Sequence, residues 1–103
     1  MKKVIVAVSI TPIGTGSASV SEFIAESLKV LDKYPDIKYE IDPMFTILYG
    51  DKEKIFKAII KMQEAMFKKG AMRVSTVIKI DERRDKEQSP LDKIESLKKH
   101  FKK

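Results

Sequence analysis

The chain has 103 residues, 43% of them hydrophobic and 35% charged, and its 21 Lys and Arg against 15 Asp and Glu give a formal net charge of +6. This length and apolar content predict one domain over residues 1–103 with a single core, and they argue against intrinsic disorder. With no Cys and one His, His100, the sequence excludes disulfides, thiolate metal sites and multi-histidine sites. We therefore predict neither a bound metal nor a cofactor.

The apolar stretches of the sequence are short. None reaches the roughly 18–20 uncharged apolar residues that span a bilayer, so no membrane partner is predicted. Val4–Ile10 resembles the apolar part of a signal peptide, but no clean cleavage site follows it. We interpret it as a strand and predict a cytoplasmic protein. The preference for Lys over Arg and the lack of Asn, Cys and Trp hint at a thermophilic source.

Positive charge is concentrated in the second half of the chain. Residues 1–50 have a net charge of −1, whereas residues 51–103 have a net charge of +7. Such asymmetry can indicate contact with nucleic acid or an anionic ligand. Because these charges alternate with apolar residues at helical spacing, solvated helix faces are the more ordinary explanation.

The chain begins with a predicted strand, loop and helix. Lys3–Ile10 is nearly continuous in apolar, β-branched residues, which predicts a central strand buried on both faces. A loop over 11–17 follows, after which Ser17 or Ser19 can cap a helix. Apolar residues at helical spacing then predict an amphipathic helix that ends before Pro35, with an apolar face made of Val20, Phe23, Ile24, Leu28 and Leu31.

The middle of the chain predicts a strand hairpin and a second helix. Apolar and polar residues alternate over 37–42, as in a half-exposed strand, and residues 45–49 form a third strand paired with it. Asp51 can cap the helix that follows, and Gly70 is a typical helix end. The apolar stripe of this helix consists of Ile55, Ile59, Met62 and Met66.

The last third predicts a fourth strand over Arg73–Ile80, a charged loop over 81–88 and a helix that opens at Ser89-Pro90. The helix is predicted to face inward with Leu91, Ile94, Leu97 and Phe101. The order strand-helix-strand, repeated twice, predicts an α+β fold, the ferredoxin-like βαββαβ sandwich, with an extra C-terminal helix.

Strands one, three and four carry apolar residues in both of their alternating sets. Helices cover one face of such a sheet, so a monomer would expose an apolar patch, and such patches usually mark an interface. We predict self-association as a dimer or a tetramer that packs sheet on sheet. A charge at Ala7 or Leu48 is then expected to disturb assembly more than a charge at Lys38.

Small hydroxyl side chains interrupt the apolar central strands. They are Ser9, Thr11, Thr46, Ser75 and Thr76. A hydroxyl buried among Val and Ile costs about 1–3 kcal/mol when it lacks a hydrogen-bond partner. That partner can be a backbone carbonyl, a water or a bound polar ligand.

Two further segments are candidates for binding. The loop with Gly14, Thr15 and Gly16 joins a strand to a helix, where backbone N–H groups can hold an anion, although a tight connection that needs glycines explains it equally well. It matches no nucleotide fingerprint. Asp81–Asp85 contains five consecutive charges and two of the three arginines. It can form an intersubunit ion-pair cluster, an anion site or a solvated turn.

Three segments of the chain resemble the small thiamine-binding protein family. They are Pro12–Gly16 with Ser19–Ser21, Tyr39–Thr46, and Arg73–Asp85 with its Arg-Arg-Asp ending. The resemblance covers nearly the whole chain. It implies a ferredoxin-like fold, dimers that pair into tetramers, and binding of thiamine or its hydroxymethylpyrimidine moiety without known catalysis.

The resemblance and the strand hydroxyls together predict a ligand site at an oligomer interface. Phe45 or Tyr49 can stack on the pyrimidine ring, and Glu40, Asp42 or Asp85 are the nearest acids for the positive thiazolium. Since Tyr49 stands where the family usually has an acid, we expect the neutral pyrimidine half to contribute most of the affinity. The predicted ligand-binding residues are Ser9, Thr11, Gly14, Thr15, Phe45, Thr46, Tyr49, Ser75, Arg84 and Asp85.

Other functions on this fold fit less well. A nucleic-acid-binding or regulatory module is the main alternative, but RNA-recognition modules carry aromatic residues on the first strand, and residues 3–10 contain none. An acylphosphatase-like enzyme would need an Arg in the first loop and a catalytic Asn, and this chain has no Asn. Without Cys and with one His near the C-terminus, no nucleophile and base can be paired, so we predict that the protein is not an enzyme.

Overall fold

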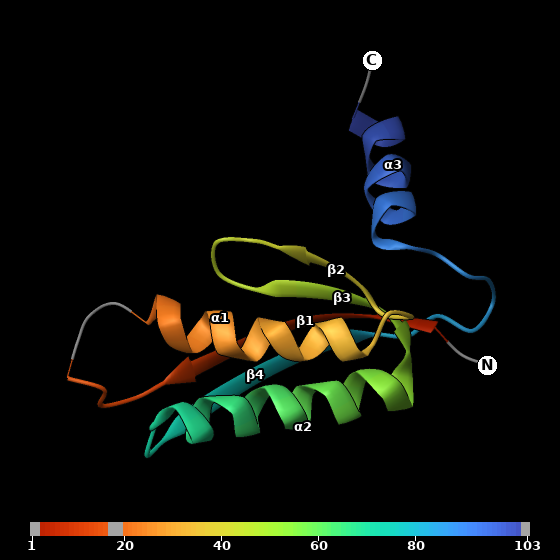
Figure 1. The fold of residues 1–103 in the computed structure, drawn as a ribbon. Coiled ribbons are helices and arrows are strands. Elements are labelled where there is room, and N and C mark those ends of the chain that lie inside the picture. The colour runs from red at the N-terminus through yellow and green to blue at the C-terminus, as the bar shows by residue number, and fades with distance from the viewer. Residues whose placement is uncertain (1–2, 17–19, 102–103) are drawn as a thin grey trace.

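The computed structural model describes residues 3–16 and 20–101. The elements are β1 (Lys3–Pro12), α1 (Ser21–Lys29), the 3-10 turn η1 (Val30–Lys33), β2 (Lys38–Ile41), β3 (Thr46–Asp51), α2 (Lys52–Lys69), β4 (Val74–Asp81) and α3 (Pro90–Phe101). The strands form an antiparallel sheet in the order β2-β3-β1-β4. This is the predicted α+β fold, a ferredoxin-like βαββαβ arrangement followed by a C-terminal helix. Helices α1 and α2 pack side by side on one face of the sheet, and α3 stands on the other side (Figure 1).

Local capping explains where α2 begins and ends. The Asp51 carboxylate accepts a hydrogen bond from the backbone N–H of Lys54 at 3.1 Å, which caps the first turn. Gly70 ends the helix with φ 123°, a backbone conformation that side chains with a Cβ rarely adopt. Both ends were predicted, because a cap is formed by residues close together in sequence.

The start of α1 differs from the expectation. The helix begins at Ser21 with Val20 at the N-cap position and with no side-chain cap among the described residues. The predicted caps, Ser17 and Ser19, lie outside the described residues. The helical path continues through η1 and ends before Pro35, as predicted.

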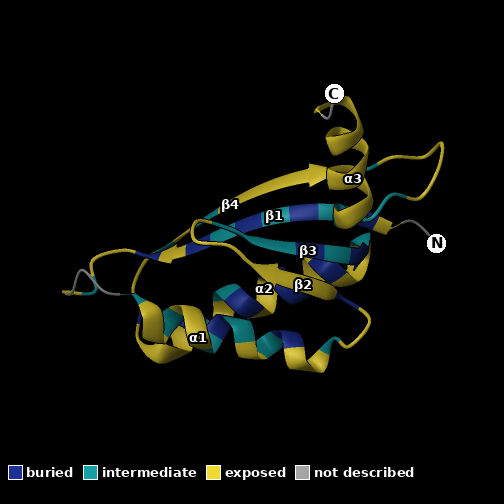
Figure 2. Ribbon diagram, turned by 90° about the horizontal axis from the view of Figure 1, so that it is seen from above, coloured by how far each residue is buried: buried dark blue, intermediate teal, exposed yellow. Residues whose placement is uncertain are grey.

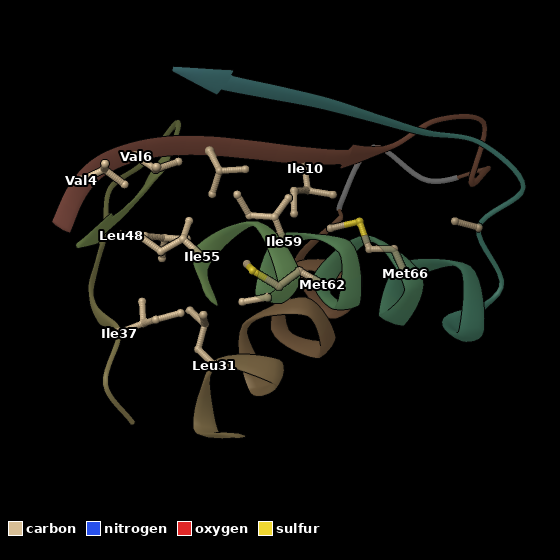
Figure 3. Close-up of a cluster of buried hydrophobic side chains, with 13 residues drawn as sticks. Val4, Val6, Ile10, Leu31, Ile37, Leu48, Ile55, Ile59, Met62 and Met66 are labelled. Atoms are coloured by element: carbon tan, nitrogen blue, oxygen red, sulfur yellow. The ribbon is translucent and has the colours of Figure 1, made fainter. Parts of the chain in front are cut away.

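The core lies between one face of the sheet and the two helices. Figure 3 shows the side chains of alternate β1 residues meeting those of α2 and η1. The largest fully buried side chains are Leu48, Ile55, Met62, Met66, Val4 and Val6. Burial in β1 alternates along the strand, so the prediction that it is buried on both faces was wrong for the single chain (Figure 2). The reason is that α1 and α2 cover one face only.

The strand register decides which residues share a face. Val8 lies opposite Thr46, and Ala7 lies opposite Ile47. Opposite residues of an antiparallel pair point to the same side, so Thr46 is on the helix-covered face with Val8. Leu48 is on that face too and has 0% exposure. Leu48 is therefore a core residue of the subunit, and its expected place on the uncovered face was wrong.

Helix α3 lies apart from the core. Residues 91–101 are all exposed, which corrects the prediction that the apolar row of this helix faces inward within the chain (Figure 2). The row is Leu91, Ile94, Leu97 and Phe101. The helical spacing was read correctly, but spacing alone does not say what the apolar row packs against. In the part of the chain that the structure describes, no helix is long and apolar enough to cross a bilayer.

Candidate functional site

The sheet face opposite α1 and α2, which we call the open face, has an apolar middle and charged edges. Its members follow from the register and include Ile5, Ala7, Ile47, Tyr49, Lys38, Glu40, Val77 and Lys79. The middle strands β1 and β3 contribute apolar residues, the edge strand β2 contributes charges, and the edge strand β4 contributes both Val77 and Lys79. This arrangement surrounds an apolar floor with polar groups.

A cavity of about 450 Å³, the α3 cavity, lies between the open face and the beginning of α3. The sheet side contributes Ile47 and Tyr49, and the helix side contributes Pro90, Leu91 and Ile94. The charged side chains that line it are Lys38, Glu40 and Asp42. Apolar walls with a few polar groups are typical of small-molecule sites.

A second cavity of about 580 Å³, the hairpin cavity, lies beside the turn between β2 and β3. Its walls are mostly apolar and include Ala7, Met44, Phe45 and Val77. Asp42 and Ile47 line both cavities, so the two form neighbouring parts of one surface.

The two acids of the α3 cavity have no cationic partner. Glu40 and Asp42 make no side-chain hydrogen bond or ion pair with any residue that the structure describes. Both residues are exposed. These two carboxylates are left available to a ligand.

Tyr49 offers an aromatic surface between the sheet and α3. Its ring lies on the open face, and the Lys3 ammonium is 5.7 Å from the ring centroid, a distance at which a cation interacts with an aromatic face. The rest of the ring borders the α3 cavity together with Ile47 and Leu91. A flat heterocycle can stack in such a position.

A local cap forms the start of α3, and an ion pair ties the helix to β4. Ser89 and Asp92 form a reciprocal cap: each backbone N–H donates to the side chain of the other residue at 3.1 Å. The Lys93 ammonium donates to the Asp81 carboxylate at the end of β4. This hydrogen bond holds the pKa of Asp81 below its ordinary value.

The charges of Asp81–Asp85 pair within the chain. Glu82 accepts hydrogen bonds from Lys52 at 2.8 Å and from Arg84 at 2.7 Å, and these bonds lower its pKa. Arg83 makes two hydrogen bonds to Asp85 and thereby lowers the pKa of that carboxyl. The structure shows ion pairs that tie this segment to itself and to α2.

The structure separates the predicted ligand-binding residues into groups. Tyr49 lines the α3 cavity and Phe45 lines the hairpin cavity. Ser9, Thr11 and Ser75 share the open face, with Thr11 opposite Ser75. Thr46 lies on the helix-covered face, and Gly14 and Thr15 lie beyond the end of β1. Arg84 and Asp85 lie in the segment after β4 and line neither cavity.

The sequence prediction of the site missed several lining residues. Glu40 and Asp42 were considered as acids for a cation but not as site residues, although the alternation over 37–42 places Lys38 and Glu40 on one face. Leu91 and Ile94 could not be found, because nothing in the sequence shows that α3 turns toward β2 and β3.

Known proteins are similar to this chain over most of its length. The family model described as thiamine-binding protein matches residues 6–98. The UPF0045 protein YqgV of Bacillus subtilis is 44% identical over 97 residues, which cover 91% of this chain and 93% of that protein. The UPF0045 protein MJ1052 of Methanocaldococcus jannaschii is 40% identical over 97 residues, covering 94% of each.

Solved structures agree with the fold. A crystal structure of the Methanocaldococcus jannaschii protein has a TM-score of 0.87 at 38% identity and covers 95% of this chain and 98% of that one. A Thermotoga maritima protein has a TM-score of 0.75 at 20% identity, covering 92% and 98%, which supports the fold alone. The matched family model and these relatives show that this chain is a member of the thiamine-binding protein family.

Proposed function

We propose that this protein binds thiamine or its hydroxymethylpyrimidine moiety, without catalysis, and that the α3 cavity holds the ligand. The family is described by a ligand and not by a reaction. The Thermotoga maritima protein of the same fold is described as a candidate thiamine biosynthesis/salvage protein. The observation that carries the proposal is one cavity that combines an aromatic ring, apolar walls and two unpaired carboxylates.

The chemistry of thiamine matches these walls. Its aminopyrimidine ring is flat and can stack on Tyr49 between Ile47 and Leu91. Its thiazolium ring is positively charged, and Glu40 or Asp42 can lie near that charge. Of the three acids considered from the sequence, Asp85 is ruled out for this cavity because it does not line it and is paired with Arg83.

The proposal that the protein is not an enzyme rests on residue chemistry. A hydrolase or transferase of the common kinds pairs a nucleophile with a base within hydrogen-bond reach. The chain has no Cys, and its one His, His100, lies on the exposed outer part of α3. The side chains at the α3 cavity suit binding better than proton transfer to or from a nucleophile. A cytoplasmic location stays a prediction.

We also propose that the protein self-associates as a dimer or tetramer through the open face. Val77 is 53% exposed there, and Ile5, Ala7 and Ile47 are half-buried beside it. The apolar row of α3 is exposed on the same side of the sheet. Contiguous apolar surface of this kind supports an interface, and a second copy of the chain carries the same surface.

Calorimetric titration with hydroxymethylpyrimidine and with thiamine tests the proposed ligand. We expect heat with both ligands, and we expect Tyr49→Ala to weaken both because both contain the pyrimidine ring. Phe67→Ala is the matched control, since Phe67 is an exposed aromatic residue of α2 that lines neither cavity. Absence of heat with either ligand, or equal effects of the two variants, would contradict the proposal.

A further inference from the structure

We infer that the α3 cavity selects the unphosphorylated cation thiamine against its phosphate esters, with Glu40 and Asp42 as the residues that determine this specificity. The inference rests on the proposed function and adds the charge of the ligand to it. Three charged side chains line the cavity, and two of them are acidic. A ligand with a positive ring and no phosphate matches this lining.

The charge of the cavity is opposite to that of the protein. The chain has a formal net charge of +6, yet the cavity lining has one Lys, Lys38, and two acids. Lys38 and Glu40 lie on the same face of β2, where the Lys partly compensates one acid. The second acid, Asp42, is left uncompensated, and its position between the two cavities extends the negative region toward Phe45.

The arginines of the chain lie away from the two cavities, which leaves Lys38 as the cation in the lining of the α3 cavity. Arg binds phosphate through two parallel hydrogen bonds, but the three arginines line neither of the two cavities. Arg83 and Arg84 are already paired with Asp85 and Glu82. A phosphate ester in the α3 cavity would therefore bring negative charge to two carboxylates without gaining an Arg contact, and like charges placed together weaken binding.

Besides Lys38, the start of α3 is the part of the described cavity lining that favours anions, and its own Asp92 already lies there. The N-terminus of α3 borders the cavity at Ser89 and Pro90, and helix N-termini favour negative charge. The Asp92 carboxylate accepts the N–H of Ser89, the Asp92 N–H donates to Ser89, and Pro90 has no N–H to offer. The negative charge that this helix end can hold is supplied by its own Asp92.

The test is calorimetric titration at neutral pH with three ligands: hydroxymethylpyrimidine, thiamine and thiamine diphosphate. For the unmodified protein we expect thiamine to bind at least about tenfold more tightly than the diphosphate. For the double variant Glu40→Gln with Asp42→Asn, thiamine affinity should fall about tenfold while hydroxymethylpyrimidine affinity stays the same. The preference for thiamine over the diphosphate should then be lost.

The control variant is Glu53→Gln with Glu64→Gln. It changes the net charge by the same amount, but both residues are exposed on α2, away from the cavities. It should keep the preference for thiamine. Equal affinity for thiamine and its diphosphate in the unmodified protein, or a preference that survives in the Glu40 and Asp42 variant, overturns the inference while the proposed function stands. If none of the three ligands binds, the proposed function fails and the inference fails with it.

Discussion

Leu48 and Ile41 are aliphatic residues on neighbouring strands that face the same side of the sheet, yet their environments differ. Leu48 has 0% exposure on β3, whereas Ile41 on the edge strand β2 is 61% exposed. Removal of buried methyl groups costs both their transfer free energy and that of the cavity left behind. We expect Leu48→Ala to lower the free energy of unfolding by about 2–5 kcal/mol.

The same change at Ile41 serves as the control. Ile41→Ala should shift the free energy of unfolding by about 0.5 kcal/mol or less, because surface substitutions usually do. Denaturant titration of both variants measures the difference. If the two variants unfold alike, the strand register that places Leu48 in the core is wrong.

Glu82, in the segment after β4, pairs with two cations: Lys52 at the start of α2 and Arg84 in its own segment. These hydrogen bonds lower the pKa of Glu82 in the folded protein. A carboxyl with a lowered folded pKa stabilises the fold above its unfolded pKa of about 4.3, and that contribution is lost as the pH falls through the folded pKa. We expect Glu82→Gln to lower the melting temperature at pH 7 and to have a smaller effect at pH 3, where more of the carboxyl is protonated.

Glu87→Gln is the control for this pH dependence, since Glu87 is exposed and forms no ion pair with the described residues. It should leave the melting temperature unchanged at both pH values. Arg84→Lys should have a smaller effect than Glu82→Gln, because the bond from Lys52 remains. A Glu82→Gln variant that melts like the unmodified protein at pH 7 would show that the segment is only a solvated turn.

At the scale of elements, one ion pair joins α3 to the sheet within the described residues. Lys93 joins the first turn of α3 to Asp81 at the end of β4. The residues of α3 that wall the cavity, Leu91 and Ile94, are exposed and add little to the core. We expect Lys93→Ala to reduce ligand affinity severalfold, as measured by calorimetry, without lowering the melting temperature of the core.

Lys98→Ala tests whether the loss of ligand affinity is specific to Lys93 or follows from the removal of any Lys of α3. Lys98 is exposed in the last turn of the same helix and makes no ion pair within the described residues. Ligand affinity should survive this change. Unaltered binding by Lys93→Ala would mean that α3 is not a wall of the ligand site.

The elements that the sequence predicted well are those whose signals are local. The ends of α2 follow from Asp51 and Gly70, and the strand order follows from the repeated strand-helix-strand pattern. The face of each β3 residue was harder to predict, because a shift of one residue in the hairpin exchanges the two faces. That is why Leu48 was expected on the uncovered face and Thr46 among the ligand residues.

The α3 cavity was not predicted as a site for a related reason. Alternation over 37–42 and an aromatic residue at Tyr49 were visible in the sequence, and both belong to the cavity. The contribution of Leu91 and Ile94 depends on how residues 82–88 direct α3 back to the sheet. The path of this connection cannot be predicted from sequence periodicity, because its residues form neither a helix nor a strand.

For the whole molecule, the open face and the apolar row of α3 are exposed apolar surface of the kind that favours self-association. Helices cover one side of the sheet, and the other side carries apolar residues around Ala7. A second copy would remove this surface from water, and apolar burial contributes roughly 25 cal/mol per Å². We expect light scattering at micromolar concentration to give a mass two or four times the 11.8 kDa of one chain.

Ala7→Glu tests the interface directly, because Ala7 lies in the middle of the open face between Ile47 and Lys79. A charge buried between two sheets without a partner is costly, so the assembly that this variant forms should have a lower mass than that of the unmodified protein. Ala25→Glu adds the same charge on the exposed side of α1 and should assemble normally. Lys38→Glu, at the edge of the open face, should have an effect between the two.

A mass of 11.8 kDa for the unmodified protein would contradict self-association, and normal assembly of Ala7→Glu would place the interface on another surface.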